Sequence, residues 1–284
     1  MTLRAQGNIS FQRKADYTVV DWLWRQGRLK ADGTLGNTSN GDNNNTAWWI
    51  NFPQFKDGVG ALGGGDVTVL AGHDISGLSV SAPTNARLKG KDIVPTASNL
   101  LTQGGGEVRV TAGGDIRNGE FYAAAGDMTL TAGKAFGAPA TDVAPAIANA
   151  IAPGDGLVRV RAGGAQVAQI ADPFLSPQAP GNIAATPPLA QNTKRITYFS
   201  NYTPASSVEL TSLAGDVTLL SGASNILPGH LGLAALNGSL TVNGNLTLAP
   251  APNGNLDLFA AGSIRIADSL AMSDVAVSAL ASPL

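Results

Sequence analysis

The sequence predicts an all-β solenoid: a parallel β-helix with about 20 residues per coil and two irregular excursions. Three observations support this fold class. A short phrase recurs along the chain, apolar and polar residues alternate within it, and the composition is rich in turn formers, with 35 Gly, 16 Pro and three Met. No long stretch of Leu, Glu and Lys at helical spacing occurs, so we expect few long helices.

The recurring phrase reads apolar, polar, apolar, any residue, small, Gly, a small or polar pair, then apolar. Its copies start 41, 20, 30, 59 and 39 positions apart, and four of these gaps lie close to multiples of 20. "LRAQGNI" at 3–9 is the back half of a seventh copy, so we expect Met1 to be a cut inside a repeat. The six copies are "VTVLAGHDI" (67–75), "VRVTAGGDI" (108–116), "MTLTAGKAF" (128–136), "VRVRAGGAQV" (158–167), "VTLLSGASNI" (217–226) and "LDLFAAGSI" (256–264).

Alternation within each copy indicates a short strand with one apolar face. Val67 and Val69 point to one side and Thr68 to the other. Such a strand is not stable alone, but coils stacked at a strand spacing of about 4.8 Å join these faces into one core. An antiparallel sandwich is the alternative, because Asn-Gly turns also form hairpins. The spacing near multiples of 20 favours the solenoid.

The same phrase divides the chain. Residues 1–10 form a partial coil, and residues 60–136 and 207–284 are β-helix coils. Residues 11–59 form a Trp-containing excursion that breaks the repeat, as a hairpin or cap packed on the flank of the coils. Residues 137–206 form an Ala/Pro-rich excursion with one interposed coil strand near 157–167, because Pro is kept out of central strands.

The four tryptophans are the candidate ligand-binding residues. Trp22 and Trp24 lie in "DWLW", and Trp48 and Trp49 in "AWWINF". Paired aromatic rings with polar neighbours form a platform for sugar rings. The alternative is that these large side chains attach the excursion to the coils, and this is the more frequent use of buried Trp.

The remaining polar residues carry no catalytic motif. A residue repeated once per coil at a corner is first a turn former, and this describes Asp66, Asp115, Asp127 and Asp216. Outward arginines form a solvated face, or a stripe for acidic polysaccharide if the coils align them: Arg109, Arg159, Arg161 and Arg265. His73 and His230 are far apart and outside any metal-spaced motif, so we predict no metal, no cofactor and no enzyme activity. Sequons at Asn37, Asn44 and Asn201 permit glycosylation without indicating it.

Charge and composition exclude several partners. The net charge of −2 argues against nucleic acid and against a polybasic membrane patch. No run of 18 apolar residues is present to span a bilayer, so we expect no membrane insertion. Cysteine is absent, so disulfides, thiolate metal sites and a cysteine nucleophile are excluded.

"GALGGGDVTVLAGHDISGLSVSAPTNARL" (60–88), with its repeated "AGG-D-I" turns, resembles the filamentous haemagglutinin-like exoproteins of bacterial two-partner secretion. The resemblance implies a right-handed β-helix shaft, exported through an outer-membrane transporter and then secreted or displayed on the surface of a Gram-negative bacterium. It also implies an adhesive role, with host-cell or surface glycans and proteins as partners. The secretion domain of that family carries an Asn-Pro-Asn-type motif, and this chain has only "APNGN" (251–255), so we expect an interior segment.

Two other functions stay open at this point. A β-helical carbohydrate-active enzyme, a polysaccharide lyase or hydrolase, requires acids from adjacent coils to meet in a groove. A passive spacer requires no ligand. Unpaired strand edges at the ends of the coils also predict end-to-end self-association, unless a flap caps them.

Overall fold

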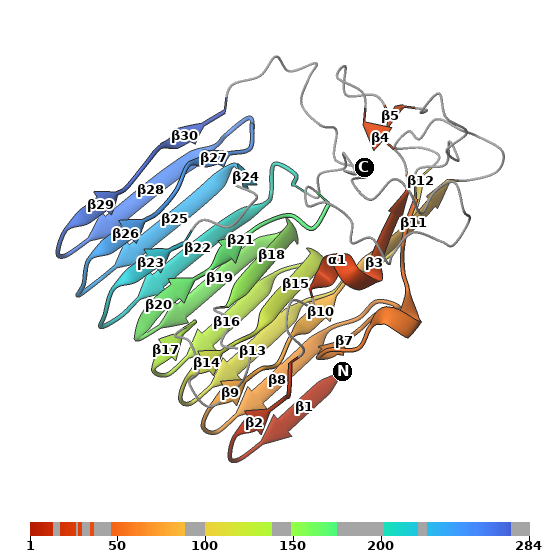
Figure 1. Cartoon of the computed structure of the whole chain (residues 1–284), viewed down its shortest axis with the longest axis horizontal. Coiled ribbons are helices and arrows are strands. Elements are labelled where there is room, and N and C mark those ends of the chain that lie inside the picture. Colours follow the sequence, from red (N-terminus) through yellow and green to blue (C-terminus); the bar gives the residue numbers. More distant parts are fainter. Residues whose placement is uncertain are drawn as a thin grey trace.

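The computed structural model describes residues 1–13, 18–26, 28–29, 35–36, 47–88, 100–137, 149–174, 202–220 and 226–273. Within these ranges the chain is all-β, and helical structure is confined to α1 (Val19–Trp22) and a single 3-10 turn, η1 (Phe52–Gln54). None of the helices in the described ranges is long and apolar enough to cross a membrane. Figure 1 shows most strands side by side in one long stack that follows the order of the chain.

Two eight-stranded parallel sheets, which we call sheets A and B, contain a strand from every pass of the chain. Sheet A contains, in spatial order, β1 (Thr2–Ala5), β8 (Val67–Ala71), β13 (Val108–Ala112), β16 (Met128–Ala132), β19 (Leu157–Ala162), β22 (Ser207–Ser212), β25 (His230–Ala235) and β28 (Asn255–Ala260). Sheet B contains β2 (Ile9–Ser10), β9 (Ile75–Ser76), β14 (Ile116–Arg117), β17 (Ala135–Phe136), β20 (Gly164–Val167), β23 (Val217–Leu219), β26 (Leu240–Val242) and β29 (Ile264–Ile266).

Two shorter parallel sheets, C and D, supply the third strand of each pass. Sheet C contains β7 (Val59–Gly60), β10 (Val80–Ala82), β15 (Glu120–Ala125), β18 (Ala150–Asp155) and β21 (Gln169–Ile170), and sheet D contains β24 (Ile226–Leu227), β27 (Leu246–Leu248) and β30 (Leu270–Met272). The chain visits A, B and then C or D, so β13, β14 and β15 form one pass and β16, β17 and β18 the next. This order is consistent with the predicted β-helix, in which every sheet gains one strand per coil.

The register of sheet A gives the length of each pass. Val108 pairs with Met128, which is 20 positions later and equals the predicted repeat. Val208 pairs with Leu231, 23 positions later, and Leu231 pairs with Leu256, 25 positions later. The other passes are longer because they carry segments that leave the parallel sheets.

The core lies between the parallel sheets and is formed by the residues that alternate along each strand. Val67, Val69 and Leu130 are 1%, 0% and 0% exposed. The alternate residues of the same two strands, such as Thr68 and Thr129, point outward. Burial of each such side chain contributes about 1.5–3 kcal/mol, so the stacked apolar columns are the main stabilising interaction. The predicted faces of the repeated phrase are therefore confirmed.

The "AG" of the phrase marks the corner at which sheet A ends. The last inward position is always small: Ala71, Ala112, Ala132, Ala162, Ser212 and Ala235. Glycine follows in four of these strands, as Gly72, Gly113, Gly133 and Gly163, because neighbouring passes approach closely there. A Cβ on Gly113 would lie 2.2 Å from the carbonyl oxygen of Gly72, and one on Gly133 would lie 2.2 Å from that of Gly113.

A four-stranded antiparallel sheet lies outside the parallel sheets (Figure 1), and we call this sheet together with α1 the flap. Its strands are, in order, β12 (Leu100–Gly104), β11 (Thr84–Leu88), β6 (Ala47–Ile50) and β3 (Leu23–Gln26), and β4 (Arg28–Leu29) pairs with β5 (Leu35–Gly36) between β3 and β6 in the chain. The β3–β6 hairpin comes from the predicted Trp excursion. β11 and β12 come from within residues 60–136, where the sequence predicted coils throughout. Gly104, Gly105 and Gly106 return the chain to sheet A with φ of +91°, +79° and +148°, which other residues rarely adopt.

The Ala/Pro-rich stretch 137–206 contributes more strands to the parallel sheets than the one predicted. β19 and β20 correspond to the strand expected near 157–167, and β18 and β21 join sheet C. Pro153 lies within β18, which has β15 on one side and β21 on the other, although Pro is normally kept out of such central strands. β21 pairs only with Ala150 and Ile151, so within the described residues one edge of β18 is free at Pro153 and no hydrogen bond is lost there. The rest of the excursion, at 138–148 and 175–201, lies outside the described residues.

Candidate functional site

Two of the four tryptophans, Trp22 and Trp48, are placed for packing. Trp22 and Trp48 are only 2% and 4% exposed, so neither ring has a face open to a ligand. The ring of Trp22 packs edge-on against Phe55 at 5.2 Å between centroids. Trp49 is half-buried, and Trp24 lies in β3, where its side chain is outside the described residues.

Trp48 shows how the flap is attached. Its indole Nε1–H donates to Thr84 Oγ1 over 3.0 Å, and its ring meets Phe174 edge-on at 5.2 Å. Trp48 and Phe174 belong to a second apolar cluster that also contains Tyr122 and Ala152 from the outer face of sheet C. Sheet C is therefore buried on both faces, which explains the continuous apolar run "FYAAA" in β15.

A buried carboxyl group lies where the flap meets sheet C. Glu120, in β15, accepts the backbone N–H of Val19 at 3.0 Å and lies 3.7 Å from Arg13 Nη2. Its side chain is 13% exposed. Burial raises the pKa of Glu120 to about 7, against the opposing effect of Arg13 and the Val19 bond and with smaller raising effects from Asp21 and Asp57. This carboxyl group is enclosed, so it belongs to the attachment of the flap and is not a ligand site.

The repeated aspartates link one pass to the next. Each accepts a backbone N–H from the following pass, which makes it more than the local turn former that the sequence predicted. The distances from nitrogen to carboxylate oxygen are 2.9 Å for Glu107 to Asp66, 2.9 Å for Ala135 to Asp115, 3.0 Å for Leu157 to Asp127 and 2.7 Å for Ser239 to Asp216.

The arginines divide between two sheets. Arg109 and Arg159 occupy the same outward column of sheet A, with Thr129 between them in register. Arg161 lies two positions along the strand from Arg159, on the same face. Arg265 belongs to β29 of sheet B and is not part of this row. The parallel strands therefore bring three of the four arginines to one face of sheet A.

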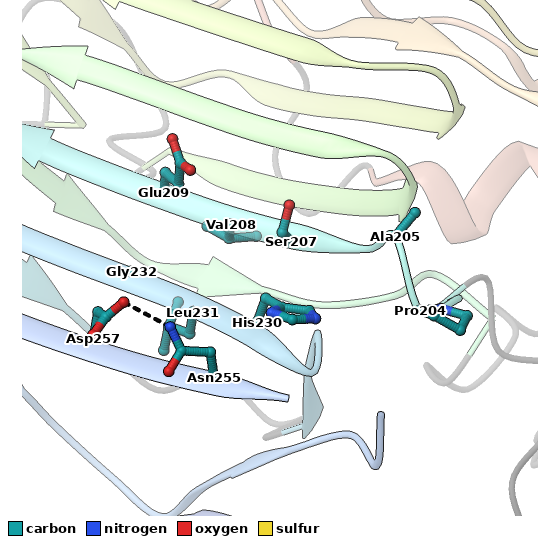
Figure 2. A pocket seen from close by; sticks show the side chains of 10 residues that line it. All are labelled: Pro204, Ala205, Ser207, Val208, Glu209, His230, Leu231, Gly232, Asn255 and Asp257. Carbon is teal, nitrogen blue, oxygen red and sulfur yellow. Dashed lines mark hydrogen bonds between the residues drawn. The ribbon is translucent and has the colours of Figure 1, made fainter. Parts of the chain in front are cut away.

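The same face of sheet A holds a groove of about 370 Å³ farther along the stack, across β22, β25 and β28 (Figure 2). The outward column of sheet A that contains Arg109 and Arg159 continues through Glu209, Gly232 and Asp257. These last three residues line the groove. Figure 2 shows Glu209 and Asp257 on either side of Gly232. Because Gly232 has no side chain, the outward surface is hollowed between the two carboxylates.

A second column completes the polar lining. Ser207, His230 and Asn255 are in register on the three strands and lie at one end of the groove (Figure 2). Asn255 Nδ2 donates to Asp257 Oδ2 at 2.7 Å, which orients both side chains. Glu209 accepts from Arg159 Nε at 3.0 Å, outside the groove. The groove thus combines carboxylate acceptors with hydroxyl, amide and imidazole groups, a set that suits hydroxylated ligands.

Sequence reasoning found one member of this groove, His230, and did not predict a site there. The missed residues, Glu209, Gly232 and Asp257, occupy the position between the two apolar residues of the phrase, which holds Thr or Arg in earlier copies. Departure from that pattern in three successive passes was the available signal. His73 is exposed in a corner between β8 and β9. The sequons at Asn37, Asn44 and Asn201 lie outside the described residues.

Within the described residues, no three His, Cys, Asp or Glu side chains gather closely enough to hold a metal ion. The chain was also compared with protein-family models, curated proteins and solved structures. None of the three comparisons finds a match.

Proposed function

We propose that the chain forms a right-handed parallel β-helix and serves as a structural and adhesive shaft segment of a large secreted or surface-displayed exoprotein of a Gram-negative bacterium. The observation that carries this proposal is the in-register growth of sheets A and B, by one parallel strand per pass, over eight passes. Right-handed coiling is proposed because crossovers between parallel strands take that hand in nearly all cases.

The stacked ladders support a mechanical role. Every pass is bonded to the next along the strands, and several passes are also linked through corner aspartates such as Asp115. A rod built this way holds distal modules away from the cell, in keeping with the resemblance to filamentous haemagglutinin-like exoproteins. A chain without Cys also suits export in an unfolded state through an outer-membrane transporter.

We place the adhesive contact in the groove of sheet A and not on Trp22 or Trp48. Trp22 and Trp48 are buried, whereas the groove is open and lined by Glu209, His230 and Asp257. Hydrogen bonds to charged groups contribute about 1.5–3 kcal/mol each, so two carboxylates and the neighbouring amide are sufficient for weak binding of a sugar. Surface glycans are accordingly the proposed ligand class.

A carbohydrate-active enzyme is the second candidate, because two carboxylates share the groove. Their backbone positions are two strand spacings apart, about 9.5 Å, which is near the upper limit of the separation of about 6.5–9.5 Å between carboxyl groups in inverting glycosidases. A general acid is normally shielded from water, whereas the Glu209 side chain is 50% exposed and paired with Arg159. Binding without hydrolysis is therefore the better-supported function.

A polysaccharide panel, read both for retention of the protein and for release of products, tests the proposal. Gly232→Val fills the groove without strain, because a Cβ there meets nothing closer than 3.9 Å. Ala234→Val is the matched control, on the same strand and the same outward face but outside the groove. We expect retention that is lost in Gly232→Val and kept in Ala234→Val, with no products. Released oligosaccharides would favour the enzyme, and no retention at all would favour a passive spacer.

A further inference from the structure

The outward face of sheet A changes the sign of its charge along the stack. We call the outward column that contains both Arg109 and Asp257 the central column, and it is in register across every strand from β13 to β28. In spatial order its residues are Arg109, Thr129, Arg159, Glu209, Gly232 and Asp257. The first half is basic, the second half is acidic, and each half has an uncharged residue in its middle. The central column is therefore complementary to its own reverse.

A second copy of the chain presents this reverse after a two-fold rotation about the strand direction. With the axis midway between β19 and β22, the outward faces meet and the order of the strands is inverted. Arg109 then faces Asp257 of the second copy, and Asp257 faces Arg109 of the second copy. A rotation about the stack direction would instead place each arginine against its own equivalent. Complementary charges therefore favour the first arrangement.

The centre of this contact is a network of ion pairs. Arg159 Nε donates to Glu209 at 3.0 Å within one chain, and the two side chains are 40% and 50% exposed. The rotation places this pair against its own copy, so each Arg159 also faces a Glu209 of the other molecule. Four alternating charges result, and a network of several charges is more stabilising than an isolated exposed pair.

The groove of sheet A receives a side chain from the second copy. Gly232 lies between the two carboxylates of the groove (Figure 2) and faces Thr129 of the second copy in this arrangement. Thr129 points outward from β16, and the groove of about 370 Å³ has room for it. The hollow over Gly232 therefore matches a residue on the opposite half of the same column.

The outward columns on either side are compatible with the same rotation. Asp127, directly before β16, faces His230 of the second copy, and Arg161 faces Thr211. Among the described residues of these columns, no facing pair between β13 and β28 brings like charges together. Six strands and three outward columns outline a face of about 29 Å by about 20 Å, or about 1,200 Å² over both copies. This area is at the lower limit of specific interfaces, so the contact is weak and reversible.

We propose that the outward face of sheet A, from β13 to β28, binds a second copy of this chain laterally, with the two stacks running in opposite directions. The occupant is a second copy because the face matches its own reverse in charge and in shape. The contact is isologous, so it closes as a dimer and differs from the end-to-end association that the sequence predicts. It covers the groove, so dimerisation and glycan binding compete, but it does not depend on the adhesive function.

Sedimentation of the full chain over a wide concentration range tests the proposal with charge-reversal variants. Arg109→Asp and Asp257→Arg change exposed positions, and each places like charges opposite one another at two symmetry-related places in the dimer. A 1:1 mixture of the two variants restores opposite charges at both places. Arg265→Asp makes the same change on the outward face of sheet B and is the matched control. Circular dichroism confirms that each variant keeps its strands.

The wild-type chain is expected to form a reversible dimer, and each of the two variants to dimerise more weakly by roughly tenfold or more. Their mixture should recover the wild-type affinity, and Arg265→Asp should behave as wild type. A monomeric wild-type chain at the highest concentration overturns the proposal. So does a mixture that associates no more tightly than either variant alone, or an equal loss in Arg265→Asp. Oligomers larger than a dimer that neither variant weakens also overturn it, because they indicate association through the strand edges.

Discussion

The carboxyl group of Glu120 provides the sharpest test of how the flap is attached. We predict that Glu120→Gln removes most of the pH dependence of flap stability. The amide is similar in size and keeps an oxygen that accepts the Val19 N–H, but it carries no charge at any pH. Arg13 and the Val19 bond remain next to it.

The pKa shift sets the size and the direction of the effect. Burial raises the pKa of Glu120 from an ordinary 4.5 to about 7, so the folded chain holds this proton more tightly than the unfolded chain. The resulting stabilisation is fully present below pH 4.5 and is lost as the pH rises through about 7. At about 1.4 kcal/mol per pH unit, the free energy of unfolding falls by about 3 kcal/mol between pH 4 and pH 8.

Tryptophan fluorescence during urea titration is the appropriate assay, because all four tryptophans lie between residues 22 and 49. Wild type and Glu120→Gln should agree near pH 4, and the variant should be more stable by about 3 kcal/mol at pH 8. Glu107→Gln makes the same chemical change at an exposed site and should retain the wild-type pH dependence. The reasoning is refuted if Glu120→Gln retains it too, or if the wild-type transition is the same at pH 4 and pH 8.

Three further predictions concern the stack itself. Leu130→Ala empties a fully buried column position and should lower the free energy of unfolding by about 2–5 kcal/mol, measured by circular dichroism in urea. Gly113→Ala should be destabilising in the same assay because its Cβ meets a carbonyl oxygen at 2.2 Å, whereas Gly63→Ala, with nothing within 4 Å, should be neutral. Asp115→Ala leaves the N–H of Ala135 without its acceptor and should cost about 1–3 kcal/mol, with faster hydrogen exchange at that amide.

Five of the six predicted copies of the phrase lie in sheet A, and their pattern predicted the parallel core. The copy that starts at Val217 lies instead in β23 of sheet B, where Val217 pairs with Ala165 and Leu240, so the gaps of 59 and 39 positions did not correspond to whole coils. Period-two alternation in "VTV" and "VRV" identified the buried faces of β8 and β13, and the 20-position offset between Val108 and Met128 predicted their stacking. Alternation is local to each strand, so one sequence is enough to detect it.

The flap depended on contacts that no local pattern encodes. Residues 84–88 form a strand, as their composition allows, but its partners are Trp48 and the 100–104 segment in antiparallel pairing. The buried state of Glu120 likewise depends on Arg13, more than 100 positions away. The sequence therefore predicted the excursion and its aromatic residues, but it did not predict how these residues are arranged in space.

The groove was missed for a related reason. Its column contains Glu209, Gly232 and Asp257, and it becomes visible only when three passes are aligned in register. The passes there are 23 and 25 positions long, and "HLGLAALNG" departs from the common phrase. A site built from one residue per pass has no sequence motif of its own.

Distance measurement along one column of sheet A tests the central claim most directly. The chain has no Cys, so spin labels can be attached at Cys residues introduced in place of Thr68, Glu209 and Asp257, which share one outward column four and six strand steps apart. Parallel stacking predicts separations of about 19 Å for 68–209 and about 29 Å for 68–257. A difference of about 10 Å supports the β-helix. Equal distances, or a shorter one for 68–257, would contradict it.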